Sequence, residues 1–216
     1  MSLIQPLKNP PDGPLKIGAL ISGGGTTVLN LLDKMESGEL SSEVNLVIAS
    51  RDNCSGIEKL NAKGINVDVV PRNDFSDVKN FSESIFTKLR EANVDLVVLA
   101  GFLSLIEIPE DYYYRVINIH PGLIPSFCGK GFYGGNVHQA AIDRGVKVSG
   151  CTVHFADNIY DHGPIIVQKT VPVLDTDSAD MLAKRVFEVE CEALPEAIQL
   201  FGSGKLTIDG SIVRIS

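Results

Sequence analysis

Residues 16–27 read Lys16-Ile17-Gly18-Ala19-Leu20-Ile21-Ser22-Gly23-Gly24-Gly25-Thr26-Thr27. The apolar run is typical of a buried parallel strand, and the glycines after it allow a tight turn into the helix that the apolar stripe from Val28 onward indicates. Apolar or alternating runs recur at 44–49, 65–70 and 95–101, with helical patterns between them. This strand-then-helix order predicts an α/β fold built on parallel strands.

The second half of the chain shows a different pattern. The runs 148–155 and 165–173 are joined by a short polar loop, which predicts two antiparallel strands. A long helix is expected from about Ser178 to Phe201, and residues 205–215 indicate a hairpin with a turn at Asp209-Gly210. We therefore predict a Rossmann-like open, mostly parallel sheet with helices on both faces and an antiparallel C-terminal portion.

Length and composition predict one domain without a membrane span. A chain of 216 residues is in the usual range of a single α/β domain. Its apolar runs all stay below the roughly 20 residues that cross a bilayer. Residues 1–15 contain four prolines and no continuous apolar core, so we expect a poorly ordered lead-in followed by one domain over residues 16–216.

Charge and cysteine content limit the class of partner. The net charge of −8 disfavours the broad basic surface that nucleic-acid-binding proteins present. The cysteines are far apart and form no C-x-x-C pair, which argues against a zinc site and against a redox dithiol. We therefore expect a cytoplasmic protein with reduced thiols, no bound metal, and neither nucleic acid nor membrane as a partner.

The strongest candidate for chemistry lies between residues 117 and 164. Asn118 and His120 are two apart in a predicted strand, so their side chains share a face, and Pro121 fixes an irregular turn directly after them. An amide and an imidazole placed in this way can hold an oxyanion and move a proton. A carboxylate would complete the group, but Asp157 and Asp161 both lie in the following polar loop, and the residue pattern does not choose between them.

Three further stretches have two interpretations each. The turn Gly23–Thr27 can bind a phosphate at a helix N-terminus, or it is a plain turn with Thr26 or Thr27 as the helix cap. Residues 103–106, after the most apolar strand, can line a ligand or close the core. The glycine-rich stretch 127–136 is either a mobile flap over the site or a surface loop with anchoring aromatic residues.

Four segments together resemble the phosphoribosylglycinamide formyltransferase family. They are Ile21–Thr27, Leu99–Phe102, Asn118–Pro125 and Val153–Pro164, and the resemblance covers nearly the whole chain from Lys16 onward. It implies the formyltransferase fold and transfer of a formyl group from the co-substrate 10-formyltetrahydrofolate to the amine of 5-phosphoribosylglycinamide in de novo purine biosynthesis. It also implies metal-free catalysis. We expect a monomer or a homodimer.

The resemblance also assigns roles to residues. It implies catalysis by Asn118, His120 and Asp161, in which Asp161 raises the pKa of His120 and helps to move the amine proton. It implies ribonucleotide binding by Gly25, Thr26, Thr27, Pro121 and Glu190. It implies folate binding by Leu103, Ser104, Leu105, Ile106, Ala156, Asp157 and Asp161. The chain departs from the family pattern at Thr27, where an asparagine is frequent, and in a longer loop at 127–136.

Other members of the wider group give the competing predictions. The main alternative is a 10-formyltetrahydrofolate hydrolase, which resembles the chain around Asn118, His120 and Asp161 but activates water in place of an amine. That enzyme usually carries an added N-terminal regulatory domain, which the 15 residues before Lys16 are too few to form. A methionyl-tRNA formyltransferase would need an RNA-binding domain with a basic surface, and a simple nucleotide-binding module would leave the Asn118 and His120 pair without a purpose.

Overall fold

The computed structural model describes residues 3–216, so the first two residues of the predicted lead-in lie outside the described residues. The chain divides into two compact units. The N-terminal unit comprises Pro11–Ile117, and the C-terminal unit comprises Asn118–Ser216 with the described part of the first ten residues. In the C-terminal unit, Ile4 and Ile208 exchange two backbone hydrogen bonds of 3.0 and 2.7 Å. The single-domain boundary at residue 16 stays a prediction.

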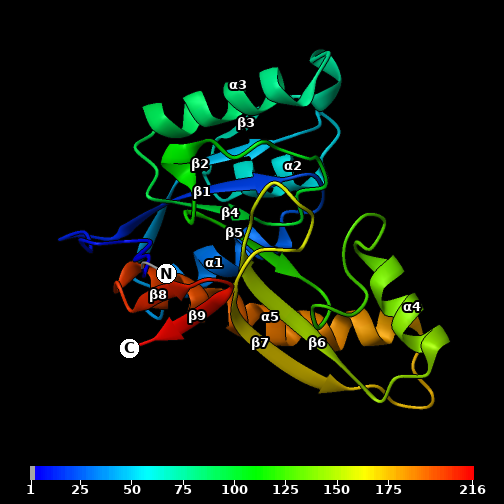
Figure 1. The fold of residues 1–216 in the computed structure, drawn as a ribbon. Helices are drawn as coiled ribbons and strands as arrows, with labels where there is room; N and C mark the ends of the chain where they lie inside the picture. The colour runs from blue at the N-terminus through cyan, green and yellow to red at the C-terminus, as the bar shows by residue number, and fades with distance from the viewer. Residues whose placement is uncertain (1–2) are drawn as a thin grey trace. The chain divides into compact units, whose positions relative to one another are not determined.

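The N-terminal unit alternates strands and helices as predicted (Figure 1). Its strands are hydrogen-bonded in the order β3-β2-β1-β4, and the β2–β3, β1–β2 and β1–β4 pairs are all parallel. The elements are β1 (Leu15–Ile21), α1 (Thr26–Glu36), β2 (Ser42–Ala49), α2 (Ser55–Ala62), β3 (Val67–Val69), η1 (Arg72–Asp74), α3 (Val78–Glu91), β4 (Leu96–Leu99) and η2 (Glu110–Tyr112).

The core of this unit forms around β1. Ile17, Leu20 and Ile21 are completely buried, as the apolar run predicts. Gly18 is required by packing, because a Cβ there would lie 2.4 Å from the Leu89 side chain of α3. The strand therefore combines large side chains with one position at which a helix comes close to the backbone.

The start of α3 is set by Asp77. Asp74 and Ser76 are suitable capping residues, but Asp74 lies in η1 and the helix begins after Asp77. The Asp77 carboxylate accepts a 2.8 Å hydrogen bond from the N–H of Asn80, the geometry of a side-chain N-cap. Asp74, Ser76 and Asp77 are all residue types that can cap a helix. Asp77 is the cap because it lies three positions before the helical N–H of Asn80.

The C-terminal unit confirms the predicted antiparallel portion. Its strands follow the order β5-β6-β7-β9-β8, with antiparallel β6–β7 and β8–β9 pairs and a parallel β7–β9 pair. Helix α5 packs along β6 and β7 (Figure 1), and its N-cap is Ser178. The elements are β5 (Val116–His120), which enters from the other unit, α4 (Gly135–Arg144), β6 (Val148–Phe155), β7 (Ile165–Pro172), α5 (Ala179–Gly202), β8 (Leu206–Asp209) and β9 (Ile212–Ile215).

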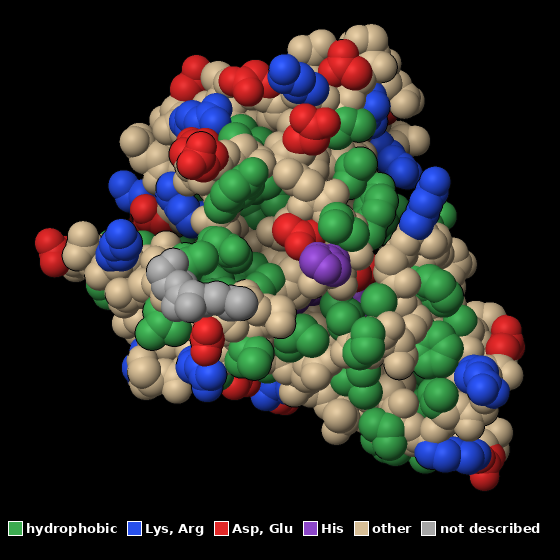
Figure 2. All heavy atoms as spheres, viewed as in Figure 1, with side chains coloured by type: hydrophobic (Ala, Val, Ile, Leu, Met, Phe, Trp, Pro, Cys, Tyr) green, Lys and Arg blue, Asp and Glu red, His purple; other side chains and the backbone are tan. Residues whose placement is uncertain are grey.

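These elements confirm the predicted fold class, a mostly parallel α/β sheet with an antiparallel C-terminal portion. Over residues 3–216, no helix has the length and apolar character needed to cross a bilayer. On the face drawn in Figure 2, basic side chains are interspersed with acidic ones and form no continuous basic area. This distribution agrees with the net charge of −8.

Candidate active site

The structure brings Asn118, His120 and Asp161 together within the C-terminal unit. Asn118 Nδ2 donates to Asp161 Oδ1 at 3.3 Å, and His120 Nδ1 lies 3.6 Å from Asp161 Oδ2. The period of two in β5 places the amide and the imidazole on one face, as predicted, and the loop after β6 supplies the carboxylate. The His120 and Asp161 side chains are 3% and 10% exposed, so the group is largely shielded from water.

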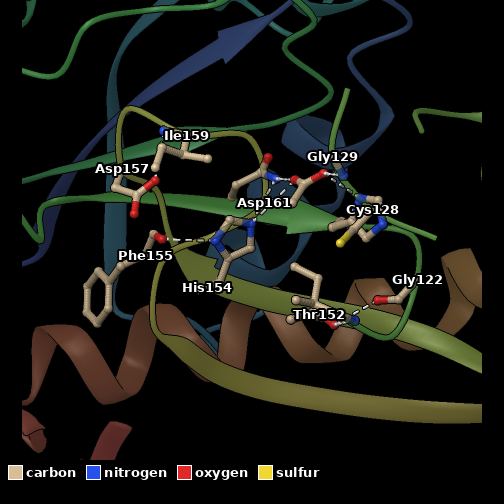
Figure 3. A network of polar contacts seen from close by, with 12 residues as sticks. Gly122, Cys128, Gly129, Thr152, His154, Phe155, Asp157, Ile159 and Asp161 are labelled. Carbon is tan, nitrogen blue, oxygen red and sulfur yellow. Dashed lines mark hydrogen bonds and ion pairs between the residues drawn. The ribbon is translucent and has the colours of Figure 1, made fainter. Parts of the chain in front are cut away.

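Asp161 and Asp157 have different environments, although they share one loop. Asp161 adopts a φ of 53°, a left-handed conformation that aspartate tolerates better than most residues, and its Oδ2 accepts the N–H of Gly129 at 2.8 Å. Asp157 instead accepts from the N–H of Ile159 and contacts the exposed imidazole of His162. Figure 3 shows Asp161 directed toward Gly129, with Asp157 apart from this group and beside Ile159. Asp157 therefore shapes the turn that presents Asp161.

His154 is a fourth member of the group that sequence reasoning missed. It lies near the end of β6, with Nε2 3.2 Å from Asn118 Nδ2 and 3.7 Å from Asp161 Oδ1. Its Nδ1 lies 2.9 Å from the Phe155 carbonyl oxygen, which can only accept, so Nδ1 carries a proton (Figure 3). A polar residue near the end of a buried strand was the available signal.

The tautomer of His120 follows from its second contact. Nε2 lies 2.9 Å from the Phe127 carbonyl oxygen, so this nitrogen carries a proton. Burial lowers the pKa of His120 below its ordinary value, and the opposing effects of Asp161 and the Phe127 carbonyl do not outweigh it. Asp161 does raise this pKa, as expected, but burial outweighs its effect. Near neutral pH the ring is mainly neutral, with its proton on Nε2.

Asp161 shows the opposite balance. Burial by itself raises the pKa of its carboxyl, but the contact with His154, the hydrogen bond from Gly129 and the nearby His120 together bring the pKa below its usual value. The carboxylate is thus ionised at neutral pH although it is largely buried. The group therefore contains a neutral imidazole that can donate a proton and a carboxylate that can accept one.

Thr152 and Gln168, on neighbouring strands β6 and β7, hold the turn that follows His120. The Thr152 hydroxyl donates to the Gly122 carbonyl at 2.7 Å and accepts the Ile124 N–H at 3.1 Å. The Gln168 amide donates to Thr152 Oγ1 and to the Ile124 carbonyl, each at 3.0 Å. This clamp leads to Phe127, whose φ of 50° is unusual for a bulky residue. The predicted glycine-rich loop is irregular here, and its start is fixed.

The turn Gly23–Thr27, in the N-terminal unit, leaves the first N–H groups of α1 without a side-chain cap. The N-cap is Gly25, at a φ of 67°, so the interpretation with Thr26 or Thr27 as the cap is wrong. Helix α2 supports the turn, because Gly56 N–H donates to the Gly23 carbonyl at 3.0 Å. An N-terminus of this kind favours an anion through its free N–H groups and its dipole.

Residues 103–106 of the same unit divide between the two interpretations. Ile106 is 5% exposed and closes the core, whereas Leu103 and Leu105 are 42% and 36% exposed. Ser104 is half-buried. The run therefore presents two apolar side chains outward, which the core-closing interpretation does not explain.

Glu190, on α5, is half-buried. Among residues 3–216 its carboxylate has neither a hydrogen-bond partner nor an ion-pair partner. Burial raises its pKa to about 7, and burial together with this carboxyl raises the pKa of the neighbouring Cys151 thiol to about 12. Glu188 and Glu192 are exposed, so only two of the three glutamates fit the predicted solvated face. A buried carboxyl without a partner is a candidate ligand-binding group.

Comparison with known proteins identifies the family. Residues 15–198 match the model of the formyl transferase family. The chain belongs to the formyl transferase family. A solved member of this family, glycinamide ribonucleotide transformylase 1 from Symbiobacterium toebii, is 36% identical, covers 95% of both chains and superposes with a TM-score of 0.87.

Two other similar proteins show how far the family assignment goes. Chloroplastic phosphoribosylglycinamide formyltransferase of Vigna unguiculata is 36% identical over 85% of this chain, and the match spans 60% of that relative's length. A formyltetrahydrofolate deformylase from Pseudomonas syringae is 24% identical, with a TM-score of 0.83 over 94% of this chain and 66% of the other. This second likeness is one of fold alone, so the fold does not distinguish transfer to an amine from hydrolysis.

Residues 3–216 contain no group of three or more His, Cys, Asp or Glu side chains arranged to hold a metal ion. The four cysteines are all free thiols, two buried and two half-buried. Of the predicted site residues, the structure brings Asn118, His120 and Asp161 into one group. Pro121, which follows His120 in the chain, and Ala156 are both half-buried. Asp157 accepts the N–H of Ile159 and so stabilises a turn.

Proposed function

We propose that the protein transfers a formyl group from 10-formyltetrahydrofolate to the primary amine of 5-phosphoribosylglycinamide, a step of de novo purine biosynthesis. The observation that carries this proposal is the convergence of Asn118, His120 and Asp161, because it combines two N–H donors with an ionised proton acceptor. The names of the relatives from Vigna unguiculata and Symbiobacterium toebii support the choice of an amine as the acceptor.

The first step is attack of the amine nitrogen on the formyl carbon. A new C–N bond forms, the carbonyl electrons move to oxygen, and a tetrahedral oxyanion results. Asn118 Nδ2, which now donates to Asp161 and lies 3.2 Å from His154 Nε2, would turn one N–H to this charge, and His120 Nε2–H would supply the second hydrogen bond. In the structure His120 Nε2–H donates to the Phe127 carbonyl, so this hydrogen bond must break before the proton can reach the oxyanion. Exchange of one acceptor for another keeps the imidazole proton paired throughout.

The second step moves a proton and releases the folate. The attacking nitrogen becomes positively charged, and the ionised Asp161 can take its proton directly or through a water molecule. Return of this proton to the folate nitrogen makes it a neutral leaving group as the original C–N bond breaks. The products are the formylated amine and tetrahydrofolate. The lowered pKa of Asp161 fits this role, because the carboxylate begins the cycle unprotonated.

Other residues would hold the two substrates. We assign the ribonucleotide phosphate to the uncapped N–H groups at Gly25, Thr26 and Thr27, supported by the Lys59 ammonium 3.4 Å from the Gly24 carbonyl oxygen. We assign the ribose hydroxyls to the unpartnered Glu190 and the glycinamide end to Pro121. The folate is assigned to Leu103, Ser104, Leu105 and Ile106, together with Ala156, Asp157 and Asp161 of the second loop.

The remaining assignments are coarser. We propose that residues 16–216 act as one formyltransferase domain, with residues 1–15 as a lead-in. We also propose a cytoplasmic location, for which the four free thiols are the support. The proposed partners are small molecules only, and the protein would act as a monomer or a homodimer. Sedimentation of the purified protein distinguishes these two states.

One assay separates the proposed transferase from the alternative hydrolase. Purified protein is mixed with 10-formyltetrahydrofolate, and tetrahydrofolate release is followed with and without 5-phosphoribosylglycinamide. We expect release to depend on the amine. The Asp161→Asn variant is the matched control for uncatalysed breakdown of the folate. Equal rates with and without the amine, both abolished in that variant, would show that the protein is a hydrolase.

A further inference from the structure

The Gly101–Glu107 loop, which follows β4 in the N-terminal unit, is held at two points by buried serine hydroxyls. The N–H of Leu103 donates to Ser22 Oγ at 2.9 Å, and the N–H of Glu107 donates to Ser82 Oγ at 2.8 Å. Ser22 is 6% exposed and Ser82 is 2% exposed. Residues 101–107 form neither a helix nor a strand. The serine hydroxyls therefore accept the N–H hydrogen bonds that backbone carbonyls accept in regular secondary structure.

Ser22 is itself fixed by the ends of two strands. It directly follows β1, and its N–H donates to the Gly101 carbonyl at 3.1 Å. Its Oγ lies 2.6 Å from the Oγ of Ser50, which directly follows β2 and is 1% exposed. A hydroxyl has one proton and two lone pairs, so Ser22 can serve Ser50 and still accept from Leu103. The first anchor therefore ties the loop to the carboxyl ends of two neighbouring strands.

Ser82 provides a second and independent anchor on α3. Its hydroxyl donates to the Val78 carbonyl one helical turn earlier, at 2.7 Å, which leaves the oxygen directed as an acceptor for Glu107. The neighbouring Phe81 ring stacks on Phe102 of the loop, with ring centroids 6.3 Å apart and planes 1° apart. One face of α3 thus holds the loop through a hydrogen bond and through an aromatic contact.

The backbone between the two anchors is unpaired. Among residues 3–216, the N–H and C=O groups of Ser104, Leu105 and Ile106 have no hydrogen-bond partner. Leu103 and Leu105, which flank this stretch, are 42% and 36% exposed. Free donors and acceptors in a row beside outward apolar side chains suit the polar edge and the flat face of a heterocycle. These groups can bind such a ligand tightly only if the loop conformation is fixed before the ligand arrives.

We propose that Ser22 and Ser82 are positioning residues that preorganise the Gly101–Glu107 loop for the pterin ring of the folate substrate. The inference rests on the proposed function, because it assigns this loop to the folate. Within the loop the two hydroxyls contact only backbone groups, so their removal would loosen a binding surface without deleting any group that contacts the ligand.

Two measurements on Ser22→Ala and Ser82→Ala test this role. Amide hydrogen exchange should become roughly tenfold faster at Leu103 in the first variant and at Glu107 in the second, the scale of one lost hydrogen bond. The dissociation constant for tetrahydrofolate, measured by calorimetry, should rise roughly tenfold in each. The Ser82→Ala variant should bind the ribonucleotide as the wild type does. Ser149→Ala, which removes another buried hydroxyl remote in sequence from the loop, should change neither quantity.

The outcomes separate this inference from the proposed function. Wild-type protein that does not bind tetrahydrofolate would overturn both. Wild-type binding with unchanged dissociation constants in the two alanine variants would overturn the positioning role alone. If Ser82→Ala unfolds, Ser22→Ala decides the question through the same measurements. Ser82→Thr keeps a hydroxyl that can bond the carbonyl four residues earlier, and should restore folate binding if the hydroxyl is what matters.

Discussion

Replacement of Glu190 by Gln should stabilise the protein at alkaline pH. Burial raises the pKa of the Glu190 carboxyl to about 7, and unfolding returns it to an ordinary value of 4.5. Between these two values the folded state binds more protons than the unfolded state, so the free energy of unfolding falls as the pH rises through this window. Glutamine has the same shape and does not ionise, so the variant should lack this decline.

The magnitude follows from the size of the shift. A carboxyl pKa raised from 4.5 to about 7 corresponds to about 3 kcal/mol of unfolding free energy lost once the group is ionised in both states. Glu190 is half-buried, and solvent contact reduces the cost, so we expect about 1–2 kcal/mol at pH 8. For a chain of this length, the unfolding temperature of Glu190→Gln should be higher by about 2–8 °C.

Thermal and chemical denaturation at pH 5, 6, 7 and 8 would measure this difference. The gap between Glu190→Gln and the wild type should be small at pH 5 and should open steadily up to pH 8. Glu188→Gln is the matched control, because Glu188 is exposed on the same helix. Parallel stability curves for Glu190→Gln and the wild type at all four pH values would refute the reasoning from burial.

The same variant separates stability from binding. In the proposed function the ionised Glu190 carboxylate accepts hydrogen bonds from the ribose hydroxyls, which an amide accepts less strongly. The ratio of the variant's KM for the ribonucleotide to the wild-type KM should therefore grow as the pH rises from 6 to 8. Use of the ratio cancels the ionisation of the phosphate itself. A more stable variant with an unchanged KM would remove Glu190 from the ribose site.

Three further predictions concern the active-site group and the two turns. His120→Ala and Asp161→Asn should each lower kcat by roughly two or more orders of magnitude, because an oxyanion donor or a proton acceptor is lost; near-normal kcat would take that residue out of the mechanism. Thr26→Val should raise the KM for the ribonucleotide and spare the KM for the folate in steady-state kinetics, and an unchanged ribonucleotide KM would reject the phosphate site. Thr152→Val should lower the unfolding free energy by about 1–3 kcal/mol, because it leaves Gly122 O and Ile124 N–H without their partner. Denaturation at wild-type midpoints would show that the Thr152 clamp is not needed.

The fold was predictable because its signals are local. Each of its signals lies within a few residues: the apolar runs, the glycine turns and the short loop between β6 and β7. The periodicity of apolar residues is therefore enough to predict the elements. The shared face of Asn118 and His120 follows from the same period of two. The cap of α3 was not predictable in this way, because Asp74, Ser76 and Asp77 all suit a cap and only the helix register chooses among them.

The site was less predictable because its contacts are distant in the chain. Asp161 is 43 residues from Asn118, and Ser22 is 81 residues from Leu103. The choice of Asp161 over Asp157 depends on a left-handed backbone at position 161, which the loop sequence does not reveal. His154 was missed because a single histidine in a buried strand is as typical of a buried structural residue as of a functional one.

Burial has opposite effects on the protonation of His120 and Asp161, and this contrast suits the proposed chemistry. Desolvation keeps the imidazole mainly neutral, with its proton on Nε2, while three contacts keep the carboxylate ionised despite its burial. A charged imidazole would pair with Asp161 and block the acceptor that the amine proton needs. A neutral imidazole can stabilise the oxyanion and leave Asp161 available, so the depressed pKa of His120 supports a division of labour between the two side chains.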